Sequence, residues 1–352
     1  MRKISLVGFL LTLMLAKAFS QATDGRAFQL NKLSKQDTLL SGWKFHAGDD
    51  PQWANPAFDD SKWQPTDPGQ DITHFEQLKN SGIGWIRLHI IADSSLTKQQ
   101  IGAWVYQFTA SEIYLDGRLI EKYGSISANK AKTIANSPVA QIFNLKLQPG
   151  ADEVIAVRLA YQPGFPYIST TFVPPPAFSM YVNSYQAALA NRQSNEVTIK
   201  LVLVNFALLT GIFLILSIVH LFYFVFDRQQ KVNLYYFIFS TALWIGAGLS
   251  TWFYNNIENV STQMWVLFID SICFIIIYLF LTLTVYSLFN YKSRFVFKAL
   301  ACVGVFGVVY QFWDGVYGYI LCTNIFSILG LLEGARACIW AIRRQKRTPC
   351  SY

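Results

Sequence analysis

Residues 201–226 read LVLVNFALLTGIFLILSIVHLFYFVF, and this stretch divides the chain into two parts of different character. It contains no Asp, Glu, Lys or Arg. A helix of about 20 apolar residues crosses the roughly 30 Å hydrocarbon layer of a bilayer. The stretch therefore predicts a membrane-spanning helix, and the segments on its two sides decide what this helix connects.

Four further apolar stretches follow the first one, at 233–253, 264–289, 296–313 and 316–342. We therefore expect an α-helical transmembrane region of about five helices over 201–342. The fourth stretch is short. The fifth carries Glu333 and Arg336, which favours a span of about 17 residues continued by an interfacial helix.

Charge predicts the orientation of these helices. Residues 21–196 contain 15 Lys and Arg against 16 Asp and Glu, a balance of −1, whereas residues 197–352 contain 11 against 5, a balance of +6. Basic residues lie after the first and third stretches and in the tail 343–352, while the breaks at 254–263 and 314–315 have none. Because cytoplasmic loops are enriched in Lys and Arg, we expect a cytoplasmic C-terminus and a membrane role, and no nucleic-acid partner.

The first 20 residues resemble a signal peptide, with Arg2 and Lys3 before an apolar run from Ile4 to Ala16 and small residues after it. A signal anchor is the alternative. We expect an exported domain over 21–182, a juxtamembrane linker over 183–200, and a multi-pass protein of a bacterial inner membrane. All five cysteines lie beyond residue 196, so this domain has no disulfide framework.

Alternating side chains predict that the exported part is a β domain. Residues 84–90 and 153–161 alternate apolar and mixed positions, and Asp116-Gly117 suits a tight turn within a hairpin over 113–120. Further strands are expected at 40–46, 101–108, 139–147 and 168–173. The predicted fold class is mixed: an antiparallel β-sandwich of the jelly-roll kind, followed by a transmembrane helical bundle.

Five short motifs occur in a characteristic order: GWKF at 42–45, PAFDDSKW at 56–63, GWIR at 84–87, IYLDGR at 113–118 and PGADEVIAVR at 149–158. This succession resembles the sugar-binding, galactose-binding-like jelly-roll domain of family 2 glycoside hydrolases, over residues 40–165. At 151–153 the chain has Ala-Asp-Glu where those hydrolases have Gly/Asn-type turn residues. The resemblance implies a carbohydrate-like ligand. The catalytic carboxylates of that family belong to a barrel outside the matching region, so we expect no catalytic residues, no enzyme activity and no cofactor.

The order of β domain, Pro174-Pro175-Pro176 and apolar helices resembles bacterial seven-transmembrane receptors with diverse intracellular signalling modules. Residues 214–237 are similar to the first two helices of that family and their basic loop. The resemblance implies a receptor-like sensor in a two-component system. This chain departs from the pattern with five readable helices and a short tail after Arg347, which implies a separate cytoplasmic signalling partner or a homodimer. Two alternatives are a truncated sensor histidine kinase and a membrane-anchored protein for glycan capture.

A loop over residues 48–65, GDDPQWANPAFDDSKWQP, carries the candidate ligand residues Trp53, Asp59, Asp60 and Trp63. In one interpretation its aromatic residues pin the loop to the sandwich, while its acidic residues and prolines shape turns. In the other, an indole and carboxylates form a rim that stacks a sugar ring and binds its hydroxyls. Carboxylates could instead hold a structural Ca²⁺, but we predict no metal site.

Two polar residues in the apolar stretches are His220 and Asp270. Ionisable side chains are costly in lipid, so we expect both to face the interior of the bundle, where they can pair with each other. They serve either as packing contacts or in signal coupling.

Overall fold

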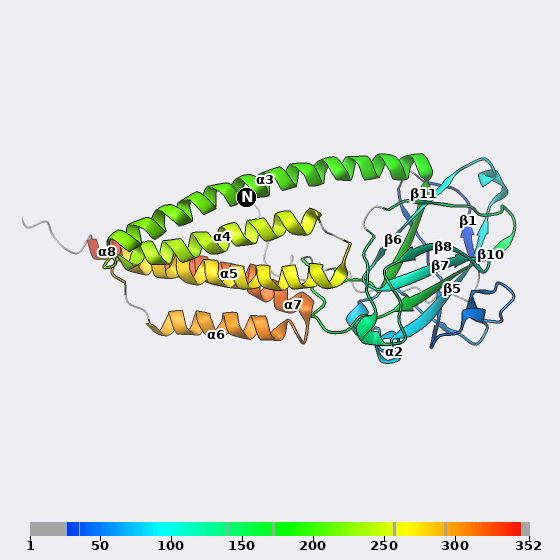
Figure 1. Cartoon of the computed structure of the whole chain (residues 1–352), viewed down its shortest axis with the longest axis horizontal. Helices are drawn as coiled ribbons and strands as arrows, with labels where there is room; N and C mark the ends of the chain where they lie inside the picture. Colours follow the sequence, from blue (N-terminus) through cyan, green and yellow to red (C-terminus); the bar gives the residue numbers. More distant parts are fainter. Residues whose placement is uncertain are drawn as a thin grey trace, which may run out of the picture.

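A computed structural model describes residues 27–345 except 35, 139–140, 171–172, 256–257 and 292–293. The expected signal peptide lies outside the described residues, as does the tail beyond residue 345. A β-sandwich occupies one end of an elongated molecule, and long helices run away from it (Figure 1).

The sandwich consists of two facing sheets. Its strands are β1 (Phe28–Leu30), β2 (Thr38–Leu39), β3 (Lys44–Ala47), β4 (Gln64–Pro65), β5 (Ile83–Ala92), β6 (Ile101–Gln107), β7 (Ala110–Leu115), β8 (Arg118–Tyr123), β9 (Phe143–Leu145), β10 (Asp152–Ala160) and β11 (Phe178–Ser184). The larger sheet has the order β4-β3-β5-β10-β7-β8, with β1 beside β5, and the smaller has the order β2-β11-β6-β9. All pairs are antiparallel except β1–β5.

Alternation along the central strands explains this arrangement. On β5, Ile86, Leu88 and Ile90 are fully buried between the sheets. Successive side chains of a strand point to opposite faces. The intervening residues therefore lie on the outer face of the larger sheet, which the loop 48–65 covers. The predicted hairpin is confirmed: Asp116 and Gly117 have φ of 48° and 81°, as a tight turn of this kind requires.

Three strand predictions differ from the structure, and the first of them, 40–46, is confirmed only over 44–46, within β3. Residues 168–170 are not a strand; Ile168 is instead buried against the helical part. The strand β11 was not predicted, because it follows directly on a run of three prolines, which is typical of a loop. The strand expected at 139–147 is reduced to β9 within the described residues.

The helical part begins without a break after β11. Its helices are α3 (Tyr185–Phe226), α4 (Lys231–Asn255), α5 (Val260–Leu288), α6 (Arg294–Tyr310), α7 (Gly315–Ile320), a π-helical turn (Leu321–Ile325) and α8 (Phe326–Gln345). The segment 183–200, expected to be a linker, consists of the end of β11 and the first four turns of α3. One short helix, α2 (Glu76–Ser81), belongs to the sandwich.

Four of these helical segments in the described residues are long and apolar enough to cross a membrane: Tyr185–Phe226, Lys231–Thr251, Val260–Leu288 and Gly315–Arg344. Phe295–Tyr310 is a shorter apolar helix. The mixed fold class with four to five apolar helices is therefore confirmed. Large apolar side chains remain exposed on the outside of the bundle, such as Leu208 at 61% and Ile215 at 63% on α3. Apolar surface this extensive is typical of a lipid-facing bundle.

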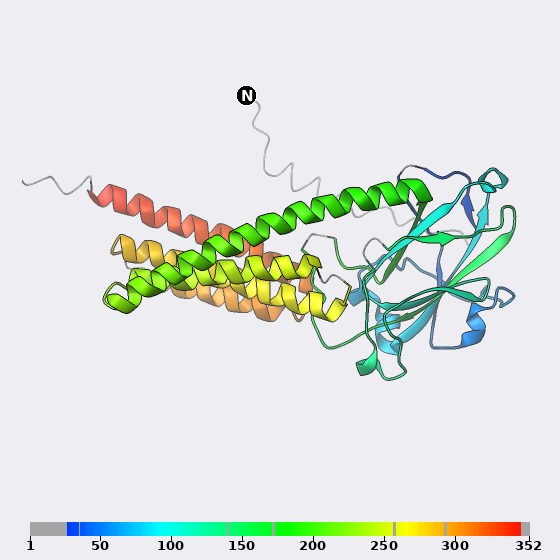
Figure 2. The same cartoon turned by 45° about the horizontal axis from the view of Figure 1, so that its top comes forward.

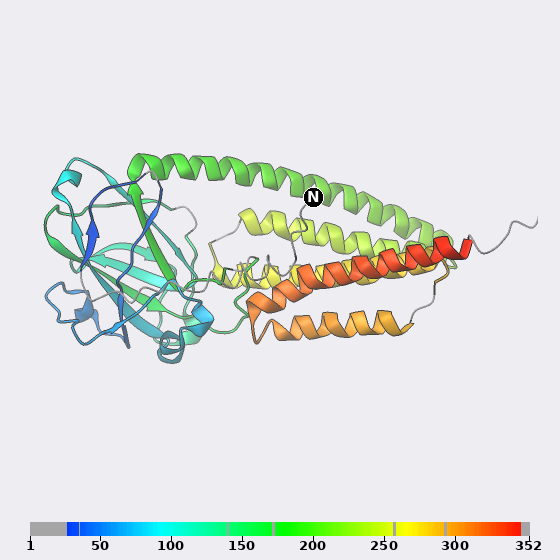
Figure 3. The ribbon, with the colours of Figure 1, turned by 180° about the vertical axis from the view of Figure 1, so that it is seen from behind.

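The helices run back and forth along one axis. α3 leads away from the sandwich, α4 returns, α5 leads away again, α6 returns, and α8 leads away once more (Figure 3). With 42 residues, α3 is about 63 Å long, about twice the thickness of the hydrocarbon layer. Figure 2 shows that α3 begins at the sandwich and that its far half lies among the other helices.

Candidate functional site

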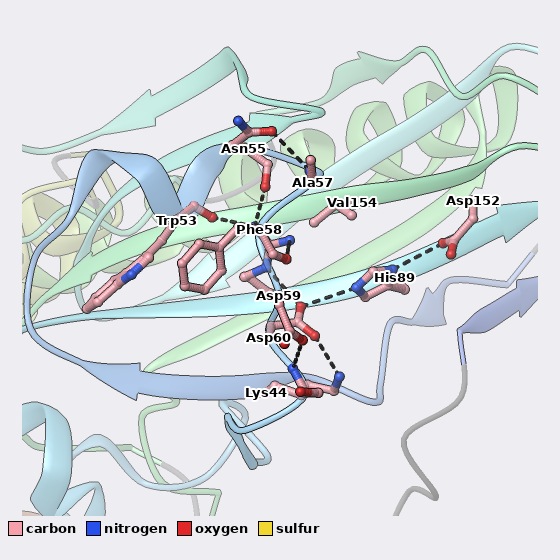
Figure 4. A network of polar contacts seen from close by, with 12 residues as sticks. Lys44, Trp53, Asn55, Ala57, Phe58, Asp59, Asp60, His89, Asp152 and Val154 are labelled. Carbon is pink, nitrogen blue, oxygen red and sulfur yellow. Dashed lines mark hydrogen bonds and ion pairs between the residues drawn. The ribbon is translucent and has the colours of Figure 1, made fainter.

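The loop 48–65 lies across the outer face of the larger sheet (Figure 4). One buried cation, Arg87, fastens the loop there. Arg87 is 0% exposed. Its guanidinium donates hydrogen bonds to three loop carbonyls, those of Trp53, Asn55 and Phe58. A planar guanidinium with several fixed donors is suited to gathering carbonyls in this way.

The carboxylate that compensates Arg87 is Asp60, which is itself only 4% exposed. Asp60 Oδ2 accepts from Arg87 Nε at 2.9 Å and lies 3.2 Å from His89 Nε2, and Oδ1 accepts from Lys44 Nζ at 2.7 Å. Buried charges are tolerated when they are paired and hydrogen-bonded, and here three basic side chains surround one acid. Asp60 therefore holds the loop against the sheet through these three contacts.

These partners change the pKa values of both groups. Burial raises the pKa of Asp60, but the hydrogen bonds from His89, Lys44 and Arg87 outweigh burial and leave the pKa below its ordinary value. The hydrogen bond to Asp60 raises the pKa of His89, with a further contribution from Asp152, whose Oδ1 is 3.3 Å from His89 Nδ1. Protonated His89 and ionised Asp60 therefore stabilise each other.

Aromatic side chains fill the space beneath the loop. Trp53 meets Trp63 edge to face, with 5.4 Å between ring centroids, and Trp85 of β5 closes the cluster from below at 6.3 Å from Trp53. Trp63 is 6% and Trp85 1% exposed. Aromatic pairs of this geometry contribute about 0.5–1.5 kcal/mol beyond the burial of their area. Most of the aromatic surface in this cluster is therefore buried by packing.

The structure thus brings together the four predicted ligand residues but leaves only two of them accessible. Asp60 and Trp63 are buried, whereas Trp53 is half-buried and Asp59 is exposed. Asp59 Oδ1 accepts from the backbone N–H of Ser61 at 2.9 Å, which makes it a turn-forming residue. In the described residues, no group of three or more His, Cys, Asp or Glu side chains could hold a metal ion.

A hollow of about 310 Å³ adjoins this loop and is lined by Phe45, His46, Ala47, Lys62, Gln64 and Gln77. The His46 ring lies 4.6 Å from that of Trp53 and 5.3 Å from that of Trp63, so the hollow shares a wall with the aromatic cluster. Its polar side chains and one aromatic wall make it the first candidate surface for a small polar ligand.

Sequence reasoning placed Arg87 on the mixed face of a strand but did not identify it as the anchor of the loop. The available signal was a charged residue between Trp85 and His89 on one face of a strand. A cation in the middle of such a face needs a carboxylate partner once the face is covered. What the sequence does not show is that Asp60 supplies it.

The two intramembrane candidates lie in different parts of the bundle, and each has another partner in place of the pairing that the sequence left open. His220, near the far end of α3, has Nδ1 at 3.1 Å from Asn233 Oδ1 of α4, and its ring lies 4.0 Å from that of Tyr236. Asp270 of α5 accepts from the Tyr319 hydroxyl of α7 at 3.0 Å. Each residue therefore joins two neighbouring helices.

A second structural feature is the joint between the sandwich and the bundle. Tyr167 and Ile168 of the sandwich share one hydrophobic cluster with Val260 and Met264 of α5 and Tyr319 of α7. The sandwich therefore touches two helix ends besides the start of α3.

Backbone contacts fix this joint. The N–H of Ser137 donates to the carbonyl of Glu258 at 2.8 Å, and the N–H of Val260 donates to the carbonyl of Ala135 at 3.3 Å. A Cβ on Gly315, the first residue of α7, would collide with the carbonyl of Tyr167. Such close backbone approach is what a glycine permits.

No protein-family model matches the chain, and no curated protein matches it. Among solved structures it is similar to a glycosyl hydrolase family 2 member from Bacteroides cellulosilyticus, with 16% identity, a TM-score of 0.29, 42% of this chain covered and 20% of that one. It is also similar to Bacteroides uniformis β-glucuronidase 2 (21% identity, TM-score 0.30, 42% and 18% covered) and to Faecalibacterium prausnitzii β-glucuronidase (12%, 0.28, 48% and 33%). The chain thus spans a third or less of the length of each of these enzymes.

Proposed function

We propose that the protein is a non-enzymatic membrane sensor. Its β-sandwich lies outside the cytoplasm and binds a small, carbohydrate-like ligand, and its helices carry the change of state across the membrane to a separate partner. The motif resemblance over residues 40–165 supports the ligand class, and the apolar helices support the membrane location.

The observation that carries this proposal is the joint. A protein that needed only an anchor would be served by one helix and a free linker, because an anchor has no need to be aligned with the domain that it holds. Here α3 starts directly after β11, and the ends of α5 and α7 pack into the core of the sandwich. Close-packed contacts transmit displacement because they leave no space to absorb it. The joint therefore favours a sensor over a glycan-capture protein.

The charge distribution supports the orientation. The sandwich lies at the end of the bundle where the breaks 254–263 and 314–315 have no basic residue. At the opposite end, Arg228 lies between α3 and α4, Lys231 begins α4, and Arg343 and Arg344 lie in the last turn of α8. The positive-inside rule then assigns the far end to the cytoplasm, in keeping with a multi-pass protein of a bacterial inner membrane.

Hydrogen bonds between polar side chains connect neighbouring helices along the bundle, and they can carry a displacement from the sandwich end to the far end. Asp270–Tyr319 joins α5 to α7 near the sandwich. Near the far end, Tyr286 of α5 donates to Glu333 of α8, and Arg336 donates to the same carboxylate at 2.6 and 2.7 Å. The helix α5 thus contacts the sandwich at one end and α8 at the other. A ligand that favours one arrangement of the joint can bias the position of α8.

The test uses the full chain in phospholipid nanodiscs, screened on an array of immobilised mono- and disaccharides. Spin labels at Gln345 and Asp227, at the far ends of α8 and α3, then report the distance between those helix ends with and without a saccharide that binds. We expect a saccharide-dependent change in the distance distribution. Labels at Lys98 and Arg118, both within the sandwich, serve as the control pair.

Two outcomes contradict the proposal in different ways. If no saccharide binds, the proposed ligand class is wrong. If a saccharide binds but the distance between α3 and α8 stays the same, the helices are an anchor and the protein is a capture protein.

A further inference from the structure

A second hollow lies where the membrane helix leaves the sandwich. The helix α3 rests on the smaller sheet at Gly102 of β6, where a Cβ would come within 3.0 Å of Tyr185 Cα and 3.1 Å of Ala188 Cβ. Beside this contact, a pocket of about 190 Å³ lies between helix and sheet. It is lined by Asp37, Trp104, Ile142, Ala188, Asn191, Arg192 and Asn195.

The helical wall of this pocket is polar. Ala188, Asn191, Arg192 and Asn195 are spaced as i, i+3, i+4 and i+7, so they form one face of α3. Ala188 is buried against the sheet, whereas the three polar residues of this face are exposed. Asn191 and Asn195 make no side-chain hydrogen bond among the residues that the structure describes, and because both are exposed, their amides, each with two donors and an acceptor, are accessible to a ligand from solution.

The sheet wall combines an indole with a carboxylate. Trp104 stacks on Tyr181 of β11, with 4.3 Å between ring centroids and 12° between ring planes, so the indole is held in a fixed orientation. Asp37 Oδ1 accepts from Asn183 Nδ2 at 3.0 Å, which positions that carboxylate at the edge of the pocket.

We propose that this pocket binds one neutral sugar ring, either as a free monosaccharide or as the end of a glycan. The indole offers an apolar surface for the C–H face of the ring, while the Asn191 and Asn195 amides and Asp37 offer partners for its hydroxyls. The volume is below the roughly 300 Å³ at which sites for drug-sized ligands begin, which fits one ring. Among the described residues that line the pocket, the one cation is Arg192, and its pairing with Glu196 at 3.0 Å favours a neutral sugar over an acidic one.

This inference rests on the proposed sensor function and gives it a location. Half of the pocket wall is α3, which continues unbroken to Phe226. A ring that bridges Trp104 and the face of α3 would favour one angle between the sheet and the helix. Binding at this pocket acts on the membrane helix directly, whereas binding at the hollow beside the loop 48–65 would not.

The test repeats the saccharide array with the full chain in phospholipid nanodiscs, which avoids detergents with sugar headgroups. The variants are Trp104→Ala and Asn191→Leu, and the second fills the pocket from the helix side without altering the sheet. Asn80→Leu, at an exposed position of the short helix α2, is its matched control. Trp53→Ala tests the other aromatic surface.

We expect both pocket variants to weaken saccharide binding by about tenfold or more, as the loss of an aromatic platform or of the space for the ring requires. We expect Asn80→Leu to bind as the unaltered chain does, and Trp53→Ala, which leaves the pocket against Trp104 intact, to lose less binding than either pocket variant. If Trp104→Ala fails to fold, Asn191→Leu decides alone. If Trp53→Ala loses binding while both pocket variants keep it, the site is wrong and the sensor proposal stands. If the unaltered chain binds no saccharide, the ligand class itself fails.

Discussion

The two outer faces of the sandwich carry similar residues, but one face is covered by a loop and the other keeps a pocket. Each has tryptophan on its surface and carboxylates close by. On the larger sheet, the chain's own loop 48–65 covers the tryptophans, and Arg87 holds Asp60 beneath it. On the smaller sheet, the covering element is α3, which touches at Gly102 and leaves a pocket against Trp104. Aromatic and acidic composition is therefore not enough to indicate a binding site. Whether another part of the chain covers the face decides whether a ligand can reach it.

The largest expected effect comes from opening the covered face. Arg87→Met removes the buried cation that holds three loop carbonyls and the Asp60 carboxylate. We expect the free energy of unfolding of the sandwich to fall by about 3–5 kcal/mol, because the buried Asp60 carboxylate loses one of its three basic partners and three loop carbonyls lose their donor. Urea unfolding of the full chain, followed by tryptophan fluorescence, measures this loss.

Arg118→Met is the control for Arg87→Met, because Arg118 is an exposed residue of β8. A similar loss in both variants would show that the loop is not held by Arg87. The two faces of the sandwich would then not differ in the way described.

A smaller effect is expected at the joint between the sandwich and the bundle, where the ends of α5 and α7 cover the sandwich. Gly315→Val places a side chain against the carbonyl of Tyr167. Overpacking of this kind costs about 1–3 kcal/mol. We expect faster amide hydrogen exchange at residues 133–137 and 258–264, on the two sides of the joint.

Gly334→Val is matched to Gly315→Val, because a Cβ on Gly334 of α8 meets nothing within 4 Å. It should leave exchange at the joint unchanged. Equal protection in both variants would mean that sandwich and bundle are independent.

A lesser change is expected at the open face. Gly102→Ala introduces a methyl group within 3.1 Å of Ala188, so α3 must shift by a few tenths of an ångström. We expect a loss of stability of about 1 kcal/mol and a measurable change in the distance between spin labels at Asn195 and Lys98. Gly150→Ala is the control for Gly102→Ala. It introduces backbone strain, because Gly150 has a φ of 82°, but no new contact, because an added Cβ would meet nothing within 4 Å. If Gly102→Ala leaves the distance unchanged, α3 does not rest on β6.

The smallest effect depends on pH. The pKa of His89 is raised by its hydrogen bond to Asp60, so its stabilising contribution is complete below the ordinary value of 6.5 and is lost as the pH rises through the higher value of the folded state. We expect the covered face to be more stable at pH 6 than at pH 8, by under about 1 kcal/mol, and His89→Gln to remove this difference. His74→Gln, at a residue whose side chain is 74% exposed, is the control. An unchanged pH dependence in His89→Gln would contradict this role.

Much of the fold could be predicted from the sequence because its signals are local. The alternation of apolar and mixed positions predicts β5 and β10, and the Asp116-Gly117 turn predicts the hairpin. The length of the apolar stretches predicts the helices. The strand β11 was missed because the prolines before it are typical of a loop. The joint was missed because nothing in residues 135–137 indicates that 258–260 lies beside them; that contact depends on the tertiary fold.

The candidate site was predicted less well, and for the same physical reason. The motif around Trp53 and Trp63 attracted attention through its composition, but the burial of Asp60 depends on Arg87, which is 27 residues away. Trp104 lay within a predicted strand and gave no sign of a site. Its significance depends on the stripe of Asn191 and Asn195 some 90 residues later, and only the folded chain brings these residues together.

The π-helical turn at Leu321–Ile325 sets the rotational phase of α8. Each residue of an α-helix advances the chain by about 100°, and a π turn holds one residue more than an α turn. Deleting a single residue there would turn Glu333 by about that angle and carry it away from Tyr286 on α5. Whether the last helix meets its neighbour with a carboxylate or with an alkyl side chain is thus decided two to three turns earlier, by one extra amino acid.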